Sequence, residues 1–421
     1  MNSTISNSHF AQILGQQVQL PCGAVLPNRF AKAAMTEQMA DSATNSPNDA
    51  IIRLYERWAA SGAGMLLTGN VMIDRIGMEN ARNVAVEDDR DLSLLRRWAD
   101  AAQSRGARLW MQINHAGRQS PKKVTAQPVA PSAVEFERGP LKTMFGRPRA
   151  LTDREIHHFI AGFARTASMA KLAGFGGVQL HGAHGYLISE FLSPRVNLRT
   201  DEWGGSSEKR MRFLLETVRA VRRETGPAFP VGVKLNSADF QRGGFSEEDS
   251  IEVVRALDAE GVDLLEISGG NYENPAMMGV RASTRSREAY FQEYAEKVRK
   301  VTAMPLMVTG GFRTAKGMAE AVSGGAVDVV GLARPLCVEP DLCARMLDGS
   351  AQEAMRIDVE TGIKIFDDML QSFWHNHQMK RMSRGLDPRI ETNKWRVLLE
   401  GIVEQAMANP FARGRAYPVA E

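Results

Sequence analysis

The sequence predicts an α/β fold: a (β/α)8 TIM barrel preceded by an N-terminal β-hairpin and followed by a C-terminal helical extension. Two observations carry this prediction. Eight short, β-rich apolar runs alternate with eight amphipathic helical segments, which is the repeat of a closed parallel barrel. The glycine fingerprint of an open dinucleotide-binding sheet is missing, because the glycine-rich stretch 174–177 follows a helical segment and precedes a strand, the reverse of the required order.

The strand candidates are short runs bounded by polar or glycine residues, and the helix candidates have apolar residues at helical spacing. Several helix candidates open with a capping pattern, as in Thr152-Asp153-Arg154-Glu155. The predicted strands are Phe30–Met35, Met65–Gly69, Arg108–Ile113, Gly177–His181, Val231–Leu235, Leu264–Ser268, Leu306–Thr309 and Asp328–Gly331. The predicted helices are Asp49–Ser61, Arg90–Arg105, Thr152–Ala173, Ser207–Thr225, Ser246–Glu260, Arg287–Val301, Thr314–Ser323 and Glu339–Leu347.

Two segments lie outside the eight units. Residues 14–29 have the pattern of a β-hairpin that closes the lower end of the barrel. Residues 351–421 carry amphipathic helical patterning, which predicts an extension packed on the barrel or on a partner subunit. No linker composition separates it from residues 1–350, which form the predicted barrel. The apolar stripes after residue 360 suggest a homo-oligomer.

Composition excludes several classes of function. With 43% hydrophobic and 24% charged residues, the 421-residue chain has the composition of a globular protein. A net charge of +3 with dispersed Lys and Arg argues against a nucleic-acid partner. No apolar run is long enough for a membrane span, and the N-terminus lacks an export signal, so we expect a cytoplasmic protein. The three cysteines form no CxxC pair, which argues against a zinc ribbon or an iron–sulfur cluster.

Catalytic candidates follow the fourth predicted strand. The stretch His181-Gly182-Ala183-His184-Gly185-Tyr186 places two imidazoles and a phenol where this strand meets a loop. In a TIM barrel that edge is the catalytic face. Neutral imidazoles can donate hydrogen bonds to a carbonyl or phenolate oxygen, and a tyrosine can supply a proton. This set of groups is suited to polarising an activated double bond.

Other strand ends supply the groups of a phosphate-bearing ligand site. Gly311 and Arg334 follow the seventh and eighth strands, where backbone N–H groups and a guanidinium can hold a phosphate. Thr36, Gln112 and Lys234, at the ends of other strands, can hydrogen-bond a flat heteroaromatic ring.

In these motifs the chain closely resembles the old yellow enzyme family of flavin-dependent ene-reductases. The matching pieces fall in the family's order over roughly residues 10–345, and the most specific is the block from His181 to Tyr186 with its tail Arg199-Thr200-Asp201-Glu202-Trp203-Gly204-Gly205. The other pieces are Leu26-Pro27-Asn28-Arg29-Phe30, Met35-Thr36, Gln112, His115-Ala116-Gly117-Arg118, Val231–Lys234, Thr309-Gly310-Gly311 and Arg334.

The resemblance implies non-covalent FMN, with NADH or NADPH as the reductant and a small electron-poor alkene as the substrate. His181 and His184 would bind the substrate's carbonyl or nitro oxygen, and Tyr186 would protonate the carbon opposite the hydride that comes from flavin N5. The implied cofactor-binding residues are Ala34, Met35, Thr36, Gly69, Gln112, Lys234, Gly311, Ala333 and Arg334. Three of these depart from the family pattern, since Lys234, Ala34 and Ala333 stand where arginine, proline and glycine are usual.

Alternatives stay open at the level of the sequence. The same flavin barrel could act as a dienoyl-thioester reductase or a dehydrogenating enzyme. A flavin-free lyase could form a Schiff base on Lys234, which could equally belong to a structural ion pair. His181 and His184 could bind zinc, although no third ligand is evident and we expect no metal site. Four further histidines on polar helical stretches are expected at the surface: His157, His158, His375 and His377.

Overall fold

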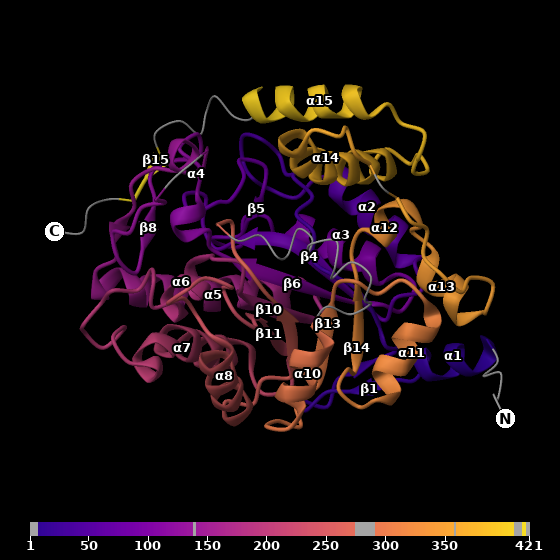
Figure 1. The fold of residues 1–421 in the computed structure, drawn as a ribbon, viewed down its shortest axis with the longest axis horizontal. Helices are drawn as coiled ribbons and strands as arrows, with labels where there is room; N and C mark the ends of the chain where they lie inside the picture. The colour runs from indigo at the N-terminus through magenta and orange to yellow at the C-terminus, as the bar shows by residue number, and fades with distance from the viewer. Residues whose placement is uncertain (1–6, 138–139, 274–290, 358, 408–414, 418–421) are drawn as a thin grey trace.

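The computed structural model describes residues 7–137, 140–273, 291–357, 359–407 and 415–417, and its centre is a closed barrel of parallel strands (Figure 1). In barrel order the strands are β3, β14, β13, β12, β11, β10, β6 and β4, and β4 pairs with β3 to close the cylinder. This confirms the predicted TIM barrel. The strands span Phe30–Lys32 (β3), Met65–Met72 (β4), Arg108–Asn114 (β6), Gly177–Gly182 (β10), Val231–Asn236 (β11), Leu264–Ser268 (β12), Leu306–Thr309 (β13) and Val329–Leu332 (β14).

Helices surround the barrel at the predicted places. Thr152 and Ser246 form capping boxes with Glu155 and Asp249, so both helices begin where the sequence pattern indicates. The first part of the sixth predicted helix, from Arg287, lies outside the described residues. The surrounding helices are α2 (Asp49–Ala59), α3 (Leu92–Gln103), α5 (Asp153–Leu172), α7 (Ser207–Thr225), α8 (Glu247–Ala259), α10 (Gln292–Arg299), α11 (Ala315–Ser323) and α13 (Leu342–Leu347).

Two strands end three residues away from their predicted ends, and four others differ by one residue at one or both ends. The first strand ends at Lys32 instead of Met35, although its ladder continues for one more bond from Ala33 N–H to the Leu332 carbonyl (2.8 Å). The following segment leaves the backbone ladder and is held instead by side-chain contacts, since the buried Glu37 carboxylate accepts from the Gly69 N–H of β4, and such tertiary contacts override strand propensity. The second strand continues to Met72 with a shift in register between Leu67 and Asn70.

The N-terminal hairpin closes one end of the barrel, as predicted. Strand β1 (Val18–Gln19) pairs antiparallel with β2 (Val25–Leu26). Val18, Leu20 and Leu26 are buried against interior barrel residues, among them Trp110. The hairpin therefore covers apolar surface that the barrel would otherwise expose at this end.

The indole of Trp110 fills the barrel interior against two glycines. A Cβ atom on Gly177 would lie 2.6 Å from Trp110 Cε2, and one on Gly232 would lie 2.9 Å from Trp110 Cζ3. Real carbon atoms do not approach so closely. These glycines therefore make room for the largest side chain of the barrel interior.

We expect Gly177→Ala to lower the free energy of unfolding by about 1–3 kcal/mol, because the added methyl group overpacks the Trp110 ring. Urea unfolding followed by circular dichroism measures this change. The matched control is Gly324→Ala, where the nearest atom to a new Cβ is 3.4 Å away and φ is −67°. An equal effect of both substitutions would show that Trp110 packing is not the cause.

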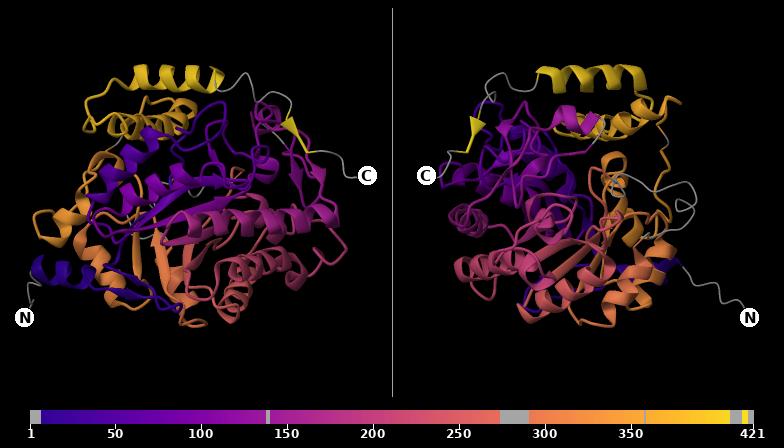
Figure 2. Two further views of the ribbon diagram at one scale, coloured as in Figure 1. Left: turned by 180° about the vertical axis from the view of Figure 1, so that it is seen from behind. Right: turned by 60° about the vertical axis from the view of Figure 1, so that its left-hand side comes forward.

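Two C-terminal helices lie over the carboxyl end of the barrel. Helix α15 (Lys394–Met407) packs on α14 (Lys364–Met382), and α14 packs on α2 and on the short helix α12 (Pro335–Val338). Figure 2 shows these two helices as a layer above the barrel from both further directions. The remaining elements are α1 (Asn7–Leu14), β5 (Val84–Ala85), the 3-10 helix Gly117–Gln119, β7 (Thr125–Gln127), β8 (Val129–Ala130), α4 (Pro140–Met144), β9 (Arg149–Ala150), α6 (Leu187–Leu192) and β15 (Arg415–Ala416).

Within the described ranges, no helix combines the length and the apolar character that crossing a bilayer requires.

Candidate active site

The three predicted catalytic side chains come together at the carboxyl end of β10. His181 belongs to the strand, His184 lies in the turn that follows, and Tyr186 caps the start of α6. The His181 ring centroid lies 4.9 Å from that of His184 and 4.9 Å from that of Tyr186. His184 has φ +62°, a left-handed conformation that non-glycine residues adopt mainly in functional or strained turns.

Both imidazoles are neutral at neutral pH. Burial, with a further contribution from the charge of Lys234, lowers the pKa of His181 and of His184 well below the ordinary value. The backbone N–H of Ala183 donates to His181 Nδ1 (3.3 Å), which assigns the proton of His181 to Nε2. His184 Nε2 is hydrogen-bonded to Ser268 Oγ (2.7 Å), so we assign Nδ1 as the nitrogen that would meet a ligand.

The Tyr186 hydroxyl lies in a part-buried group of polar side chains. It donates to Glu79 Oε2 (2.9 Å) and shares a hydrogen bond with the Tyr272 hydroxyl (2.9 Å). Burial, followed by the nearby charge of Glu79, raises the pKa of Tyr186 well above its ordinary value. The phenol therefore keeps its proton until a strong base develops beside it.

The segment after β3 brings Thr36 to the same end of the barrel, half-buried like Ala34 and Met35. Gly69 packs so closely that a Cβ there would lie 2.4 Å from the Met35 carbonyl and 2.8 Å from Thr36 Cα. The Gly69 N–H donates to Glu37 Oε1 (2.8 Å). Gly69 thus holds this segment in place through its lack of a side chain and its amide.

Two buried side chains, Tyr55 and Lys32, hold the carboxylate of Glu37 in place through a chain of hydrogen bonds. This carboxylate accepts a hydrogen bond from the Tyr55 hydroxyl, and the Tyr55 oxygen accepts one from Lys32 Nζ (3.1 Å). Asn376 of α14 donates to the Glu37 carbonyl (2.7 Å). The C-terminal extension therefore touches the residue that follows Thr36.

Gln112 and Lys234 join a polar network across the barrel interior. Gln112 Nε2 donates to Gln179 Oε1 (2.7 Å), and Gln179 Nε2 donates to Glu266 Oε2 (2.8 Å). Glu266 pairs with Lys234 Nζ (3.0 Å) and accepts from the Thr309 hydroxyl (2.8 Å). The ammonium of Lys234 is thus held beside a fully buried carboxylate.

The predicted phosphate-binding residues lie on two adjacent loops. Gly311, with φ +86°, follows β13, and Ala333 and Arg334 follow β14, which pairs with β13 through Thr309 and Gly331. Helix α14 covers this side, because it packs on α12, which begins directly after Arg334. His375 is buried, and burial is the main reason that its pKa falls to about 4. The expectation that His375 lies at the surface is therefore wrong, because α14 packs that face against the barrel.

Several functional candidates were not visible in the sequence. Glu79 lies in the loop between β4 and β5 and Tyr272 lies after β12, and neither belongs to a recognisable motif. Glu266 and Gln179 do carry a signal, since each is a polar residue inside an otherwise apolar strand. Asn70 ends up buried beside Glu79, and its Oδ1 has no hydrogen-bond partner among the described residues.

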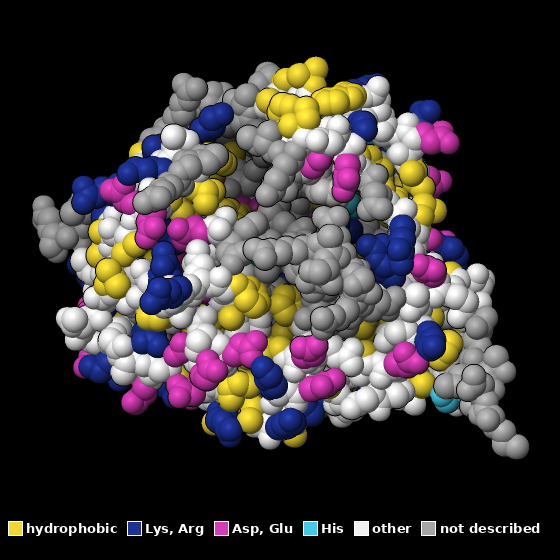
Figure 3. Space-filling view, viewed as in Figure 1, with side chains coloured by type: hydrophobic (Ala, Val, Ile, Leu, Met, Phe, Trp, Pro, Cys, Tyr) yellow, Lys and Arg dark blue, Asp and Glu magenta, His cyan; other side chains and the backbone are white. Residues whose placement is uncertain are grey.

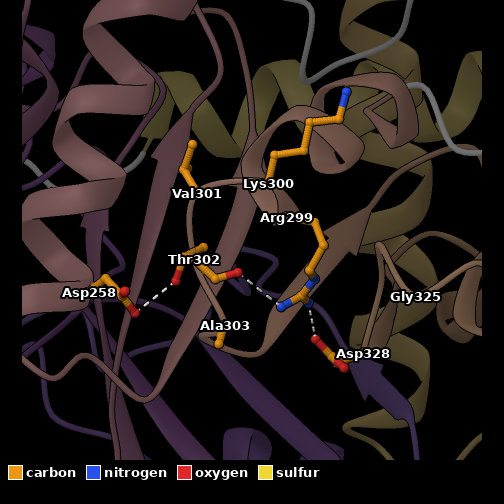
Figure 4. A pocket seen from close by; sticks show the side chains of 8 residues that line it. All are labelled: Asp258, Arg299, Lys300, Val301, Thr302, Ala303, Gly325 and Asp328. Carbon is orange, nitrogen blue, oxygen red and sulfur yellow. Dashed lines mark hydrogen bonds and ion pairs between the residues drawn. The ribbon is translucent and has the colours of Figure 1, made fainter.

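A hollow at the opposite end of the barrel has a different character. Figure 4 shows two side-chain contacts among its polar residues: Thr302 donates to Asp258 (2.7 Å), and Arg299 pairs with Asp328. It lies at the amino ends of β13 and β14, away from the imidazoles. Its lining residues are Asp258, Arg299, Lys300, Val301, Thr302, Ala303, Gly325 and Asp328.

In the described part of the chain, no group of three or more His, Cys, Asp or Glu side chains is placed to hold a metal ion. The zinc alternative for His181 and His184 therefore gains no third ligand.

The barrel and this site define an oxidoreductase of the flavin-binding class. The chain belongs to the NADH:flavin oxidoreductase / NADH oxidase family, whose profile matches residues 22–353. This confirms the predicted resemblance and, with it, the flavin and the nicotinamide reductant.

Relatives and solved structures agree with this assignment. The NADH-dependent flavin oxidoreductase iliE of Neonectria is 38% identical over 352 residues, covering 77% of this chain and 46% of the relative. The iliE protein of Hypocrea jecorina is 38% identical over 348 residues, covering 77% of this chain and 86% of the relative. A 2-naphthoyl-CoA reductase complex is 27% identical, with a TM-score of 0.75 over 80% of this chain and 52% of that one. Morphinone reductase with tetrahydroNAD is 26% identical, with a TM-score of 0.67 over 80% of this chain and 91% of that one.

Proposed function

We propose that the protein uses NADH or NADPH and non-covalently bound FMN to reduce the electron-poor C=C bond of a small molecule, an α,β-unsaturated carbonyl or nitro compound. One observation carries the proposal: two neutral imidazoles and a proton-bearing phenol lie at the end of one strand. The ring centroid of His181 lies 4.9 Å from that of His184 and 4.9 Å from that of Tyr186. This set can polarise an acceptor oxygen and protonate a developing carbanion.

The residues at the carboxyl end fit FMN. Thr36, Gln112 and Lys234 supply a hydroxyl, an amide and an ammonium for the edge of the ring system, and Gly311 and Arg334 supply a backbone amide and a guanidinium for the phosphate. The unpartnered Asn70 Oδ1 beside Thr36 is a buried acceptor that a bound ring could satisfy. The other proposed contacts come from Ala34, Met35, Gly69 and Ala333.

Bound FMN supplies the hydride. His181 Nε2 and His184 Nδ1 donate hydrogen bonds to the substrate oxygen and draw electron density from the alkene. Tyr186 gives its proton to the α-carbon as the β-carbon receives hydride. Because both imidazoles are neutral, they bind this oxygen without protonating it.

The visible absorption spectrum tests the proposal. The purified protein should show flavin bands near ~450 nm that bleach with NADPH or NADH under anaerobic conditions and return on addition of 2-cyclohexen-1-one. Denaturation should release FMN. Bleaching without recovery would refute alkene reduction, and a protein that neither contains nor takes up FMN would refute the cofactor assignment.

We expect His181→Ala to weaken binding of 4-hydroxybenzaldehyde by about tenfold or more, because a buried hydrogen bond to a phenolate oxygen is lost. Titration of the flavin spectrum with this phenol measures the affinity. His157→Ala is the matched control, because the His157 side chain is 63% exposed and lies on α5. An unchanged affinity in the His181 variant would remove His181 from the oxygen-binding role.

A thioester substrate is the second candidate. Its support is the structural similarity to a 2-naphthoyl-CoA reductase. Turnover of an unsaturated acyl-CoA but not of cyclohexenone would favour it. The Schiff-base alternative has less support, since Lys234 Nζ is already engaged in an ion pair with Glu266 (3.0 Å) and the chain belongs to a flavin oxidoreductase family.

The role of the C-terminal helices stays a prediction. We propose that residues 351–421 form an extension of the barrel, because Asn376 of α14 bonds Glu37 beside Thr36. Helix α15 exposes an apolar face that includes Trp395, Leu399 and Val403, and apolar side chains gather over it in Figure 3. Such a face is typical of self-association surfaces.

A further inference from the structure

Glu79 reaches the hydroxyl group of Tyr186 from a loop that is firmly held. The Gly77 carbonyl accepts from Ala116 N–H (2.7 Å), and the Met78 carbonyl accepts from Ser120 Oγ (2.7 Å). These two bonds fix the backbone directly before Glu79. The position of its carboxyl group is therefore set by the fold and does not depend on a free loop.

Three side chains from three parts of the chain contact this carboxyl group, and a fourth contacts Tyr186. Asn70 of β4 donates to Glu79 Oε2, the same oxygen that accepts from Tyr186 (2.9 Å). The Thr36 hydroxyl also hydrogen-bonds the carboxyl group. Tyr272, from the segment after β12, bonds the Tyr186 hydroxyl from the other side (2.9 Å).

The titratable groups that face Glu79 are two phenols and a carboxyl group. Tyr186 and Tyr272 are neutral, because burial raises the pKa of each above its ordinary value. Burial also raises the pKa of Glu79, and the negative charge of Glu37 adds to this effect, whereas the hydrogen bonds from its neighbours oppose it. The protonated acid therefore persists to higher pH than for an exposed glutamate.

We propose that Glu79 is a positioning residue that restores the proton of Tyr186 between turnovers. This inference rests on the proposed alkene reduction. A carboxylic acid in contact with the phenol through Oε2 is placed to return the proton, because the two oxygens already lie at hydrogen-bond distance.

The proton balance closes without a further reactant. The Tyr186 O–H bond breaks as its proton forms the new C–H bond at the α-carbon, which leaves a phenolate. When Glu79 carries the proton, its hydrogen bond with Tyr186 is reversed, so that the O–H group at Glu79 Oε2 donates to the phenol oxygen. This O–H bond breaks as the phenol reforms from the phenolate, and the carboxylate regains a proton from water. No electrons are transferred in these steps.

The direction in which the rate changes with pH follows from this order of proton-transfer steps. Only the protonated form of Glu79 can donate, and its fraction falls as pH rises through its raised pKa. The carboxylate also raises the pKa of Tyr186 further, which makes the phenol a weaker acid. Proton delivery is therefore expected to slow as the pH rises through the pKa of Glu79.

Steady-state reduction of 2-cyclohexen-1-one by the holoenzyme with NADPH, measured across a range of pH, tests this dependence, because every turnover after the first requires Tyr186 to regain its proton. The wild type should lose rate with rising pH, and Glu79→Gln should be about tenfold slower at low pH, with that inflection absent. Tyr272→Phe removes the other hydrogen-bond partner of Tyr186 and should keep the inflection. A Glu79→Gln variant with the wild-type pH profile would overturn the proposal.

An alkaline titration of tyrosinate absorbance gives a readout that needs no turnover. The difference from Tyr186→Phe isolates the Tyr186 phenol, and Glu79→Gln should lower the pKa of that phenol by removing a neighbouring charge. The same pKa in both proteins would contradict the coupling. If the wild type fails to reduce any enone, the proposed function fails, while this titration still decides whether Glu79 controls Tyr186.

Discussion

Tyr186→Phe is expected to slow the oxidation of the reduced enzyme by an alkene by about 10²–10⁴-fold, the range that a positioned general acid contributes. The variant loses the only atom of this side chain that can deliver a proton, while the ring that packs beside His181 remains. Reduction by NADPH or NADH requires no such proton and should keep its rate. The two half-reactions therefore separate the acid role from a structural one.

Anaerobic stopped-flow measurements of each half-reaction check this expectation. His157→Ala again serves as a control, because its exposed imidazole lies on α5 and should affect neither half-reaction. Equal losses in both half-reactions would point to damaged flavin binding and would remove Tyr186 from the acid role.

The barrel could be predicted because its signal is local and repeated. Each strand is an apolar run, and the helices that follow have apolar faces and in several cases a cap, so eight units could be counted without knowing their contacts. The prediction fails where contacts between distant residues determine the end of an element. Strand β3 ends at Lys32, and the segment that follows is held by the buried Glu37 through its hydrogen bond from Gly69 of β4, a contact that no local pattern predicts.

The candidate site also contains residues that the sequence predicts and residues that it does not. His181, His184 and Tyr186 share one short stretch, so their meeting at one strand end follows from the sequence. Glu79 and Tyr272 come from loops on two other parts of the barrel, and their contact with Tyr186 depends on how those loops fold. Burial of His375 likewise depends on where α14 lies. Spacing within one segment can be read from the sequence, whereas pairing between loops cannot.

The interior network makes the cation at position 234 important for stability. Glu266 is fully buried, and Lys234 is the cation that pairs with it at 3.0 Å. Gln179 and Thr309 donate to the two oxygens of the same carboxylate. The carboxylate is therefore satisfied by hydrogen bonds from both sides, but its charge is balanced by Lys234.

We expect Lys234→Met to lower the free energy of unfolding by about 3–5 kcal/mol, because removal of one partner leaves a buried charge uncompensated. The double variant Lys234→Met/Glu266→Gln removes both charges and should recover much of this loss. Urea unfolding of the flavin-free proteins measures the free energy of unfolding. Without bound flavin, the differences between variants report the Lys234–Glu266 pair and not a change in cofactor binding. If the double variant is as unstable as Lys234→Met alone, packing around the Lys234 side chain, and not its charge, maintains this part of the barrel.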